Sequence, residues 1–348
     1  MTGLSAFLAE EIEAGSFPGA SVLVGSADAI LAEALAGNAA IEPERREVSP
    51  DTLFDLASLT KPLCSGALVA ACGASLPLDA SPGRFLPEWN KTRFDGISLE
   101  SLLTHTSGLP AWYPLYVRGE GAAAYRRTLA DLEPAAAPGE RVIYSDLNFL
   151  LLTEVLEMVY SAPLDRAFAE TVARVAGSAA RFLPESAAAT AATERGDRFE
   201  RAMVEARGLS YPRFRSGVVE GEVHDGNAFR RGGVSGHAGL FGTARDVWAL
   251  ARGWLEPGKG AFSRDLTAEL SEARGLAWQG HRGAGSAIPE MSAGSFGHTG
   301  FTGTSVWIDP ERDRIAILLT NRIHPEVREI PFNEVRQRFH RAVYAAFP

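Results

Sequence analysis

The sequence predicts an α/β (α+β) fold in which one sheet is built from both ends of the chain and a mostly helical segment is inserted between them. Apolar runs of strand length, bounded by turn-forming residues, occur near both chain ends. They span residues 20–25, 29–36, 304–309 and 314–320. Helical periodicity dominates the stretch between them. We therefore expect a sheet domain of residues 1–57 plus 228–348 and a mostly helical domain of residues 58–227.

Helices are expected at both ends of the sheet domain. At the N-terminal end, four apolar residues recur at helical spacing before Gly15: Leu4, Phe7, Leu8 and Ile12. The last helix places apolar residues on one face, at Val335, Phe339, Ala342, Val343 and Ala346. Thr243, with Asp246 three residues later, predicts a capping box at the start of a further helix. In the inserted part, residues 119–139 are Ala-rich and predict a helix that is closed by Pro138-Gly139.

The composition excludes several classes of protein. The chain has 348 residues, a net charge of −9 and no run rich in Lys or Arg, which argues against a nucleic-acid or anionic-membrane surface. Cys64 and Cys72 lie eight residues apart on one predicted helix, too far along its axis to form a disulfide. The first residues have no basic region and are interrupted by glutamates, so we expect neither a signal peptide nor a membrane span, and a cytoplasmic location.

The stretch around Ser58 carries the strongest chemical signal. A helix that starts at Ser58 places Ser58 and Lys61 on one face at its N-terminal end, and Pro62 is tolerated only near such a start. There the helix dipole and partial desolvation both disfavour an ammonium, so Lys61 could lose its proton and activate the Ser58 hydroxyl. The alternative is a helix-capping Ser and a surface Lys. Because the chain has only three lysines and uses Arg, which cannot be deprotonated, for its other cations, the retained Lys61 favours chemistry.

Two further groups are candidates for a site. Tyr144 stands at a predicted boundary between a loop and a helix, where a phenol can project into a cleft, although a core Tyr with a satisfied hydroxyl is the alternative. His298-Thr299-Gly300 precedes a predicted strand, and the flanking glycines allow a ligand or another backbone to come close. Trp112 and its aromatic neighbours lie in a predicted loop, where they could line a pocket or fill the core.

Metal and nucleotide sites are not expected. His224 and His237 could both bind a metal, but the sequence offers no third ligand at suitable spacing. The glycine-dense loop at 232–241 requires positive φ or close backbone approach, but it lacks the strand–turn–helix pattern of a phosphate-binding loop. We therefore predict neither a metal nor another cofactor, and a small-molecule substrate. The oligomeric state is not predicted.

Three motifs, taken in order, resemble those of the serine β-lactamase and penicillin-binding-protein family: Ser-x-x-Lys at 58–61, Tyr-x-Asp at 144–146 and His-Thr-Gly at 298–300. The resemblance is greatest to the class C branch and its carboxylesterase relatives. It covers nearly the whole chain, including the segments at 103–110 and 300–304. It implies a β-lactamase-like fold, with an antiparallel sheet flanked by helices and a helical domain.

The resemblance also implies roles for particular residues. Ser58 would be the nucleophile, Lys61 its proton acceptor and Tyr144 the second acid/base group. The backbone N–H groups of Ser58 and Phe301 would form the oxyanion hole. The substrate would lie beside Asp146, His298, Thr299, Gly300 and Phe301.

Two departures from the class C pattern bear on the substrate. That branch usually has Asn at the position of Asp146 and Lys at the position of His298. A His with an ordinary pKa of about 6.5 is mostly neutral at pH 7, and Asp146 adds negative charge, so binding of a carboxylated β-lactam is disfavoured. We therefore predict a serine hydrolase that acts on esters or amides of small, uncharged acyl groups.

Alternatives remain open at this point. A β-lactamase or a D-amino-acid peptidase would act on carboxylated substrates through the same residues. A binding protein could keep the fold without turnover, although the joint presence of Ser58, Lys61 and Tyr144 argues against it. An α/β-hydrolase requires a Gly-x-Ser-x-Gly pentapeptide, and the chain contains none.

Overall fold

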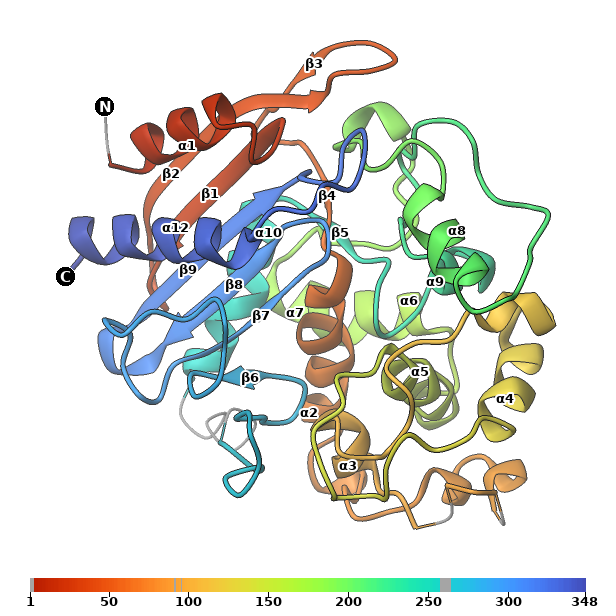
Figure 1. Ribbon diagram of the computed structural model, residues 1–348. Helices are drawn as coiled ribbons and strands as arrows, with labels where there is room; N and C mark the ends of the chain where they lie inside the picture. The colour runs from red at the N-terminus through yellow and green to blue at the C-terminus, as the bar shows by residue number, and fades with distance from the viewer. Residues whose placement is uncertain (1–2, 91, 95, 257–263) are drawn as a thin grey trace.

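The fold is organised around one antiparallel sheet. The structure is a computed structural model that describes residues 3–90, 92–94, 96–256 and 264–348. The sheet has seven strands in the order β3-β2-β1-β9-β8-β7-β6. Their bounds are β1 Gly19–Gly25, β2 Ile30–Ala40, β3 Arg46–Glu47, β6 Gln279–Gly280, β7 Phe296–Thr299, β8 Ser305–Asp309 and β9 Arg314–Thr320. Because β1 pairs with β9, the two ends of the chain meet in the middle of the sheet, as the sequence predicts (Figure 1).

Two terminal helices cover one face of this sheet. They are α1 (Gly3–Glu13) and α12 (Phe332–Ala346), which lie side by side in Figure 1. Their apolar residues share a buried cluster with side chains of β1 and β9, such as Val22 and Leu318. On α12, Val335, Phe339 and Val343 are buried as predicted, whereas Ala346 near the end of the helix is exposed.

The opposite face of the sheet packs on α10 (Ala244–Arg252) and on the helical part of the chain. The predicted capping box is present, since Thr243 accepts a hydrogen bond from the Asp246 N–H and Asp246 accepts one from the Thr243 N–H. A two-stranded sheet, β4 (Phe54–Asp55) with β5 (Phe241–Gly242), joins the sheet side to the segment that carries Ser58.

The inserted part of the chain is mostly helices and turns. Its helices are α2 (Ala67–Cys72), α3 (Leu99–Leu103), α4 (Ala122–Ala130), α5 (Asp146–Tyr160), α6 (Leu164–Phe168), α7 (Arg174–Ala176), α8 (Arg198–Glu205) and α9 (Gly226–Arg230). The helix expected over 119–139 is shorter than predicted, because only α4 is helical and the chain turns before Pro134 and Pro138. The overall fold class is confirmed, while the exact domain boundaries stay a prediction.

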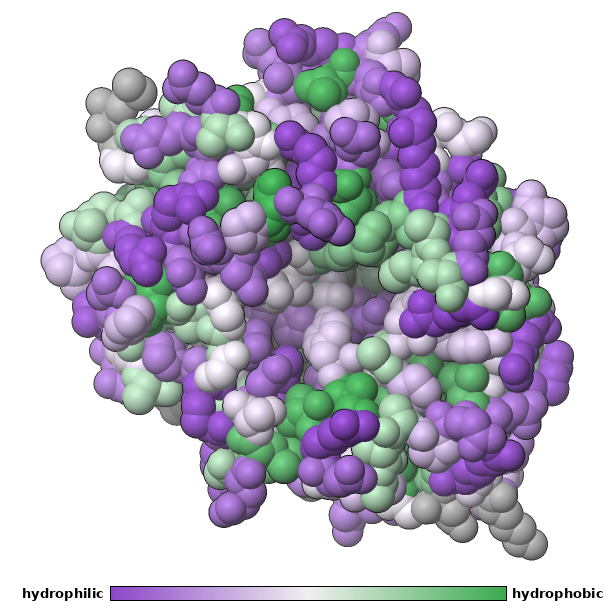
Figure 2. All heavy atoms as spheres, in the orientation of Figure 1, coloured by the Kyte–Doolittle hydropathy of each residue, from purple (hydrophilic) through white to green (hydrophobic). Residues whose placement is uncertain are grey.

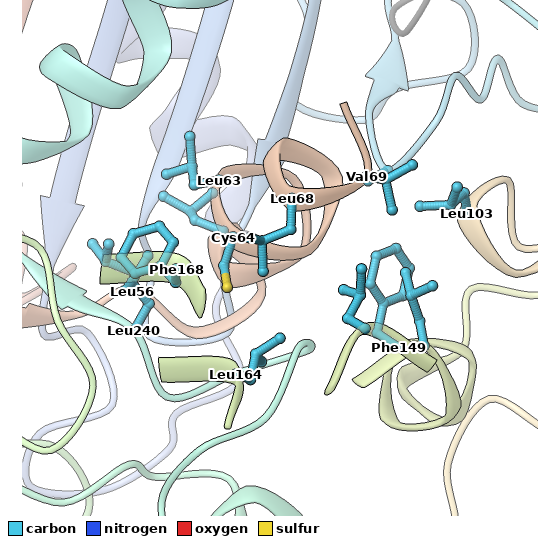
Figure 3. Packing of buried hydrophobic residues seen from close by; sticks show 14 of the residues in the cluster. Leu56, Leu63, Cys64, Leu68, Val69, Leu103, Phe149, Leu164, Phe168 and Leu240 are labelled. Atoms are coloured by element: carbon cyan, nitrogen blue, oxygen red, sulfur yellow. The ribbon is translucent and has the colours of Figure 1, made fainter. Parts of the chain in front are cut away.

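The segment that follows Ser58 runs through the centre of the core. Figure 3 shows Leu63, Cys64, Leu68 and Val69 packed between side chains of the helical part, among them Phe149 of α5. All five side chains are buried. Burial of each large apolar side chain stabilises the fold by about 1.5–3 kcal/mol. Cys64 and Cys72 are both free thiols. The turn that bears Ser58 is thus anchored by a rigid apolar helix.

No single helix within the described ranges is both long and apolar enough to cross a membrane. Helix α5 and the helical segment Leu164–Ala176 meet that requirement only when counted together, and they are bent by 69°. Residues 147–156 of α5 are all buried in the protein core.

Candidate active site

Ser58 lies on a strained turn that is held by a buried carboxylate. Ala57, directly before it, has a φ of +48°, a conformation that non-glycine residues adopt at a cost of about 1–3 kcal/mol. Asp55 Oδ1 accepts a hydrogen bond from the Ala57 N–H at 2.8 Å, and Asp55 Oδ2 accepts one from the His224 N–H at 2.8 Å. Strain of this kind persists only where surrounding contacts hold the backbone in place. Such strained residues are common at functional sites.

The helix predicted from Ser58 is present but wound differently from the expectation. Ala57–Leu59 form a 3₁₀ turn, Lys61–Gly66 form a π-helical turn, and regular α-helix begins only at Ala67. Widened turns of this kind are frequent at functional sites. This winding leaves Ser58 partly exposed and Lys61 fully buried.

The Lys61 ammonium is surrounded by three acceptors. Its Nζ donates to Ser58 Oγ at 2.8 Å, to Asp146 Oδ1 at 2.7 Å and to the His237 backbone carbonyl at 3.3 Å. An ammonium has three N–H donors, so each of them has a partner. The arrangement stabilises the charged form of Lys61.

This charge state corrects the electrostatic argument made from the sequence. Burial lowers the pKa of Lys61, as expected, but the charges of Asp146 and Tyr144 and their hydrogen bonding with Lys61 raise it above its ordinary value. The helix terminus does not decide the charge of Lys61, because the Asp146 carboxylate lies against Nζ. Lys61 therefore stands beside Ser58 as an ammonium.

Tyr144 is held by the turn that leads into α5. The next residue, Ser145, donates its N–H to His105 Nδ1 at 3.0 Å and its hydroxyl to the Pro110 carbonyl at 2.6 Å. The Tyr144 ring lies 4.6 Å from the His105 ring and 4.8 Å from Lys61 Nζ. The predicted boundary between loop and helix is confirmed, since α5 begins at Asp146.

The His298-Thr299-Gly300 motif ends a strand. It precedes a strand as predicted, since Gly300 turns the chain toward β8, but it also closes β7, which the sequence did not predict. A Cβ at Gly300 would lie 2.2 Å from Thr304 Oγ1 and 2.8 Å from the Leu56 carbonyl. Only glycine therefore allows this turn to come so close to the segment that carries Ser58.

Two backbone N–H groups at this junction have no acceptor among the described residues. Neither the Ser58 N–H nor the Phe301 N–H donates to another group in the described part of the chain, whereas the Gly300 N–H donates to the Thr304 carbonyl. Both residues line the same cavity. Unused donors that face a cavity beside a hydroxyl are what an oxyanion requires.

These groups meet in a cavity of 520 Å³. Figure 2 shows the molecule hollowed near the middle of this face, where the sheet side and the helical side meet. The cavity is lined by predicted residues from three parts of the chain: Ser58, Tyr144, Asp146, Thr299, Gly300 and Phe301. Trp112 also lines it, whereas Tyr116 belongs to the buried core.

His298 is not among the residues that line this cavity. It is buried and lines a neighbouring cavity of 280 Å³ with Tyr144 and Thr299, and its Nδ1 lies 2.9 Å from the Thr299 carbonyl. Burial lowers the pKa of His298 well below its ordinary value, and the charges of Lys61 and Arg274 add to this effect. The side chain is therefore neutral at pH 7.

Apart from Asp146, the sequence did not predict the charged residues of the cavity wall. Near Phe301 the wall holds Arg322 and Arg336, which form no ion pair with a carboxylate in the part of the chain that the structure describes. Burial lowers the pKa of Arg336 to about 9. Both side chains bond to backbone carbonyls instead, at Phe301 and Gly300 respectively.

Acidic residues lie on another part of the same wall, at Asp55, Glu200 and Asp225. Burial and the Asp225 charge raise the pKa of Glu200 to about 7. Glu200 accepts hydrogen bonds from the Tyr116 hydroxyl at 2.6 Å and from the Gly226 N–H at 2.8 Å. None of these three acids was predicted from the sequence as a site residue.

The two histidines considered as metal ligands are paired with acids. His224 Nε2 lies 2.9 Å from Glu194 Oε2, and His237 Nε2 lies 2.8 Å from Asp225 Oδ1. Across the described ranges, no group of three His, Cys, Asp or Glu side chains is arranged to hold a metal ion. His237 contributes to the site through its backbone carbonyl, which accepts from Lys61.

Comparison with known proteins identifies a family whose sequence pattern the chain matches. The profile of the family described as Beta-lactamase matches residues 4–337. A candidate D-alanyl-D-alanine carboxypeptidase of Escherichia coli (strain K12) is 29% identical over 318 residues, which cover 80% of this chain and 71% of that protein.

Solved structures share the fold. EstCE1, described as a hydrolase with promiscuous acyltransferase activity, superposes with a TM-score of 0.75 at 22% identity, over 98% of this chain and 97% of its own. A class C β-lactamase from Rhodobacter sphaeroides superposes with a TM-score of 0.71 at 18% identity, over 99% of each chain. At these identities the likeness shows the fold alone.

Proposed function

The chain belongs to the Beta-lactamase family, and from that membership we propose that it is a serine hydrolase that works through an acyl-enzyme on Ser58. The observation that carries the proposal is the 2.8 Å contact of Lys61 Nζ with Ser58 Oγ on the wall of a cavity of 520 Å³. A hydroxyl held by a buried ammonium, beside the Ser58 and Phe301 N–H groups, is suited to acyl transfer.

In the proposed acylation, Ser58 Oγ attacks the substrate carbonyl carbon while its proton moves to the phenolate oxygen of Tyr144. The carbonyl oxygen gains the negative charge and accepts hydrogen bonds from the Ser58 and Phe301 N–H groups. When the bond to the leaving group breaks, Tyr144 returns the proton to that group. Lys61 stays an ammonium throughout and stabilises the negative charge on Tyr144 and on Oγ.

Deacylation repeats these steps with water. Tyr144 takes a proton from the water molecule that attacks the acyl carbon, and Ser58 Oγ leaves with that proton. We assign the base to Tyr144 because all three N–H groups of Lys61 already have acceptors. Lys61 as the proton acceptor, which the sequence resemblance implies, is the competing assignment.

We propose esters or amides of small, uncharged acyl groups as substrates. The neutral, buried His298 supports this, because it offers no permanent charge for a substrate carboxylate. A second candidate is hydrolysis of carboxylated substrates such as D-alanyl peptides. Two observations favour this second candidate: the name of the Escherichia coli relative, and Arg322 and Arg336 on the cavity wall, which have no carboxylate partner among the described residues.

Steady-state kinetics distinguish the two. The substrates are a short-chain aryl ester, the same ester with a carboxylate on its acyl group, a chromogenic cephalosporin and a D-alanyl-D-alanine peptide. Hydrolysis of the neutral ester, lost in Ser58→Ala, supports the first candidate, and a preference for the carboxylated compounds supports the second. Turnover that survives Ser58→Ala unchanged would contradict the serine mechanism.

A further inference from the structure

A second cation lies against Tyr144, from a part of the chain far from Lys61. The Cζ of Arg274 is 5.6 Å from the centre of the Tyr144 ring, and Lys61 Nζ is 4.8 Å from it. Arg274 precedes β6 and is 5% exposed. Its Nε has no hydrogen-bond partner in the described part of the chain. The positive charge of Arg274 is thus buried beside the proposed base.

The histidines around the same ring do not add charge. The His105 ring lies 4.6 Å from the Tyr144 ring, and the His298 ring lies 5.9 Å from it. Burial lowers the pKa of both histidines well below the ordinary value, helped by the charges of Arg274 and Lys61. At pH 7 the positive charge at the Tyr144 ring therefore comes from Lys61 and Arg274.

Two carboxylates face this group of residues. Asp146, on the first turn of α5, binds Lys61 Nζ at 2.7 Å. Glu272 binds the Arg274 guanidinium at 2.5 Å, and its side chain is 39% exposed. Solvent screens Glu272 more than it screens the buried Arg274, so the field of Arg274 at Tyr144 is only partly cancelled. Arg336, on α12, also lies close enough to act on His298.

We propose that Arg274 is a positioning residue for Tyr144: its buried guanidinium, 5.6 Å from the centre of the ring, orients the ring and stabilises the negative charge that the proposed base carries. The inference rests on the proposed function, because it assigns Arg274 to the base of that reaction. Arg274 exchanges no proton. The phenolate accepts the Ser58 proton during attack and gives it to the leaving group, and the guanidinium stabilises the negative state before and after.

The test is the pH dependence of kcat/KM for Arg274→Gln on whichever ester the wild type hydrolyses best. An opposite charge within about 4–6 Å favours an ionised group by one or more pH units. We therefore expect the midpoint of the acid limb to move to higher pH by about one unit, with roughly a tenfold loss of kcat/KM below the limb. Arg274→Lys is expected to restore most of the shift.

A matched control is Arg282→Gln, which removes an Arg of the same segment whose side chain is 44% exposed and pairs with Asp265. It is expected to leave the profile unchanged. Glu272→Gln removes the counter-charge of Arg274 at an exposed position and is expected to move the acid limb slightly to lower pH. This variant keeps the inference testable if Arg274→Gln does not fold.

Rescue separates an electrostatic role from a structural one. In the Arg274→Gln background, His298→Lys returns a cation to the same ring and is expected to move the acid limb back toward the wild-type position. An unshifted limb in folded Arg274→Gln, or in folded Glu272→Gln when Arg274→Gln does not fold, would overturn the inference. So would a shifted limb that the added Lys does not move. Absence of a Ser58 adduct in the wild type would instead overturn the proposed function itself.

Discussion

Asp146→Asn tests how the charge of Lys61 is used. The substitution keeps the size and one acceptor oxygen but removes the negative charge that lies 2.7 Å from Nζ. The Lys61 side chain is fully buried and the Asp146 side chain is 22% exposed, so bulk water replaces little of the lost attraction between them. At an effective dielectric constant of about 20, the gross attraction at this distance is roughly 6 kcal/mol.

Part of that attraction is offset by the cost of burying both charges. Removing one partner of a buried pair costs about 3–5 kcal/mol. Burial lowers the pKa of Lys61 and the Asp146 charge raises it, so the loss of that charge lowers the pKa of Lys61 in the folded variant. The folded variant then loses the Lys61 proton before the unfolded chain does, so its stability rises with pH. We expect urea unfolding to show a loss of about 3 kcal/mol at pH 6 that becomes smaller as pH rises.

The activity profile of Asp146→Asn identifies the base. If Tyr144 is the base and the Lys61 ammonium supports it, the alkaline limb of kcat/KM moves toward neutral pH as Lys61 loses its proton. If neutral Lys61 is the base, the acid limb moves to lower pH and the rate at pH 7 rises, which would refute the assignment of the base to Tyr144. Glu33→Gln, which breaks an exposed pair with Arg245, is the control, with an expected loss of about 0–1 kcal/mol at any pH.

Three other variants follow from the same geometry. Lys61→Arg keeps the positive charge but cannot accept a proton. We expect its kcat to lie within about tenfold of the wild-type value, with circular dichroism as the folding control. A loss of about 10²–10⁴ in kcat would instead assign the base to Lys61. Tyr144→Phe is expected to lose about 10²–10⁴ in kcat. Tyr113→Phe is the control, because Tyr113 is not among the residues that line the cavity of 520 Å³, and it is expected to keep the rate. Glu200→Gln is expected to stabilise the protein at pH 8 but not at pH 5. In the wild type the pKa of Glu200 is raised to about 7, so the protonated side chain stabilises the fold at low pH and this contribution disappears as pH rises through that value. The size of the effect has an upper limit of roughly 3 kcal/mol. Equal melting temperatures of variant and wild type at pH 8 would contradict this.

The sequence predicted the parts of the site that short motifs encode. The spacing of Ser58 and Lys61 placed both side chains together, and Tyr144 stands where the loop meets α5. The strands near both chain ends were predicted because continuous apolar runs such as those of β8 and β9 are typical of buried strands. These features depend on residues that are close in the sequence.

Features that depend on tertiary packing were not predicted. The proton affinity of Lys61 is set by Asp146, 85 residues away, and its sign could not be known before the two were seen in contact. The helical pattern of α12 identified its buried face. It did not indicate that Arg336, which stands between apolar neighbours on this helix, lines the cavity. His298 was expected beside the substrate, but at the end of β7 it lies in the neighbouring cavity.

Covalent labelling tests the central claim most directly. The intact protein is incubated with a fluorophosphonate or a slowly hydrolysed β-lactam, digested, and mapped by mass spectrometry, with Ser58→Ala as the control. We predict a single adduct on the peptide that contains Ser58, absent from the variant. An adduct on Ser107 or Ser235 instead, or no adduct with any acylating reagent, would contradict the assignment of Ser58 as the nucleophile.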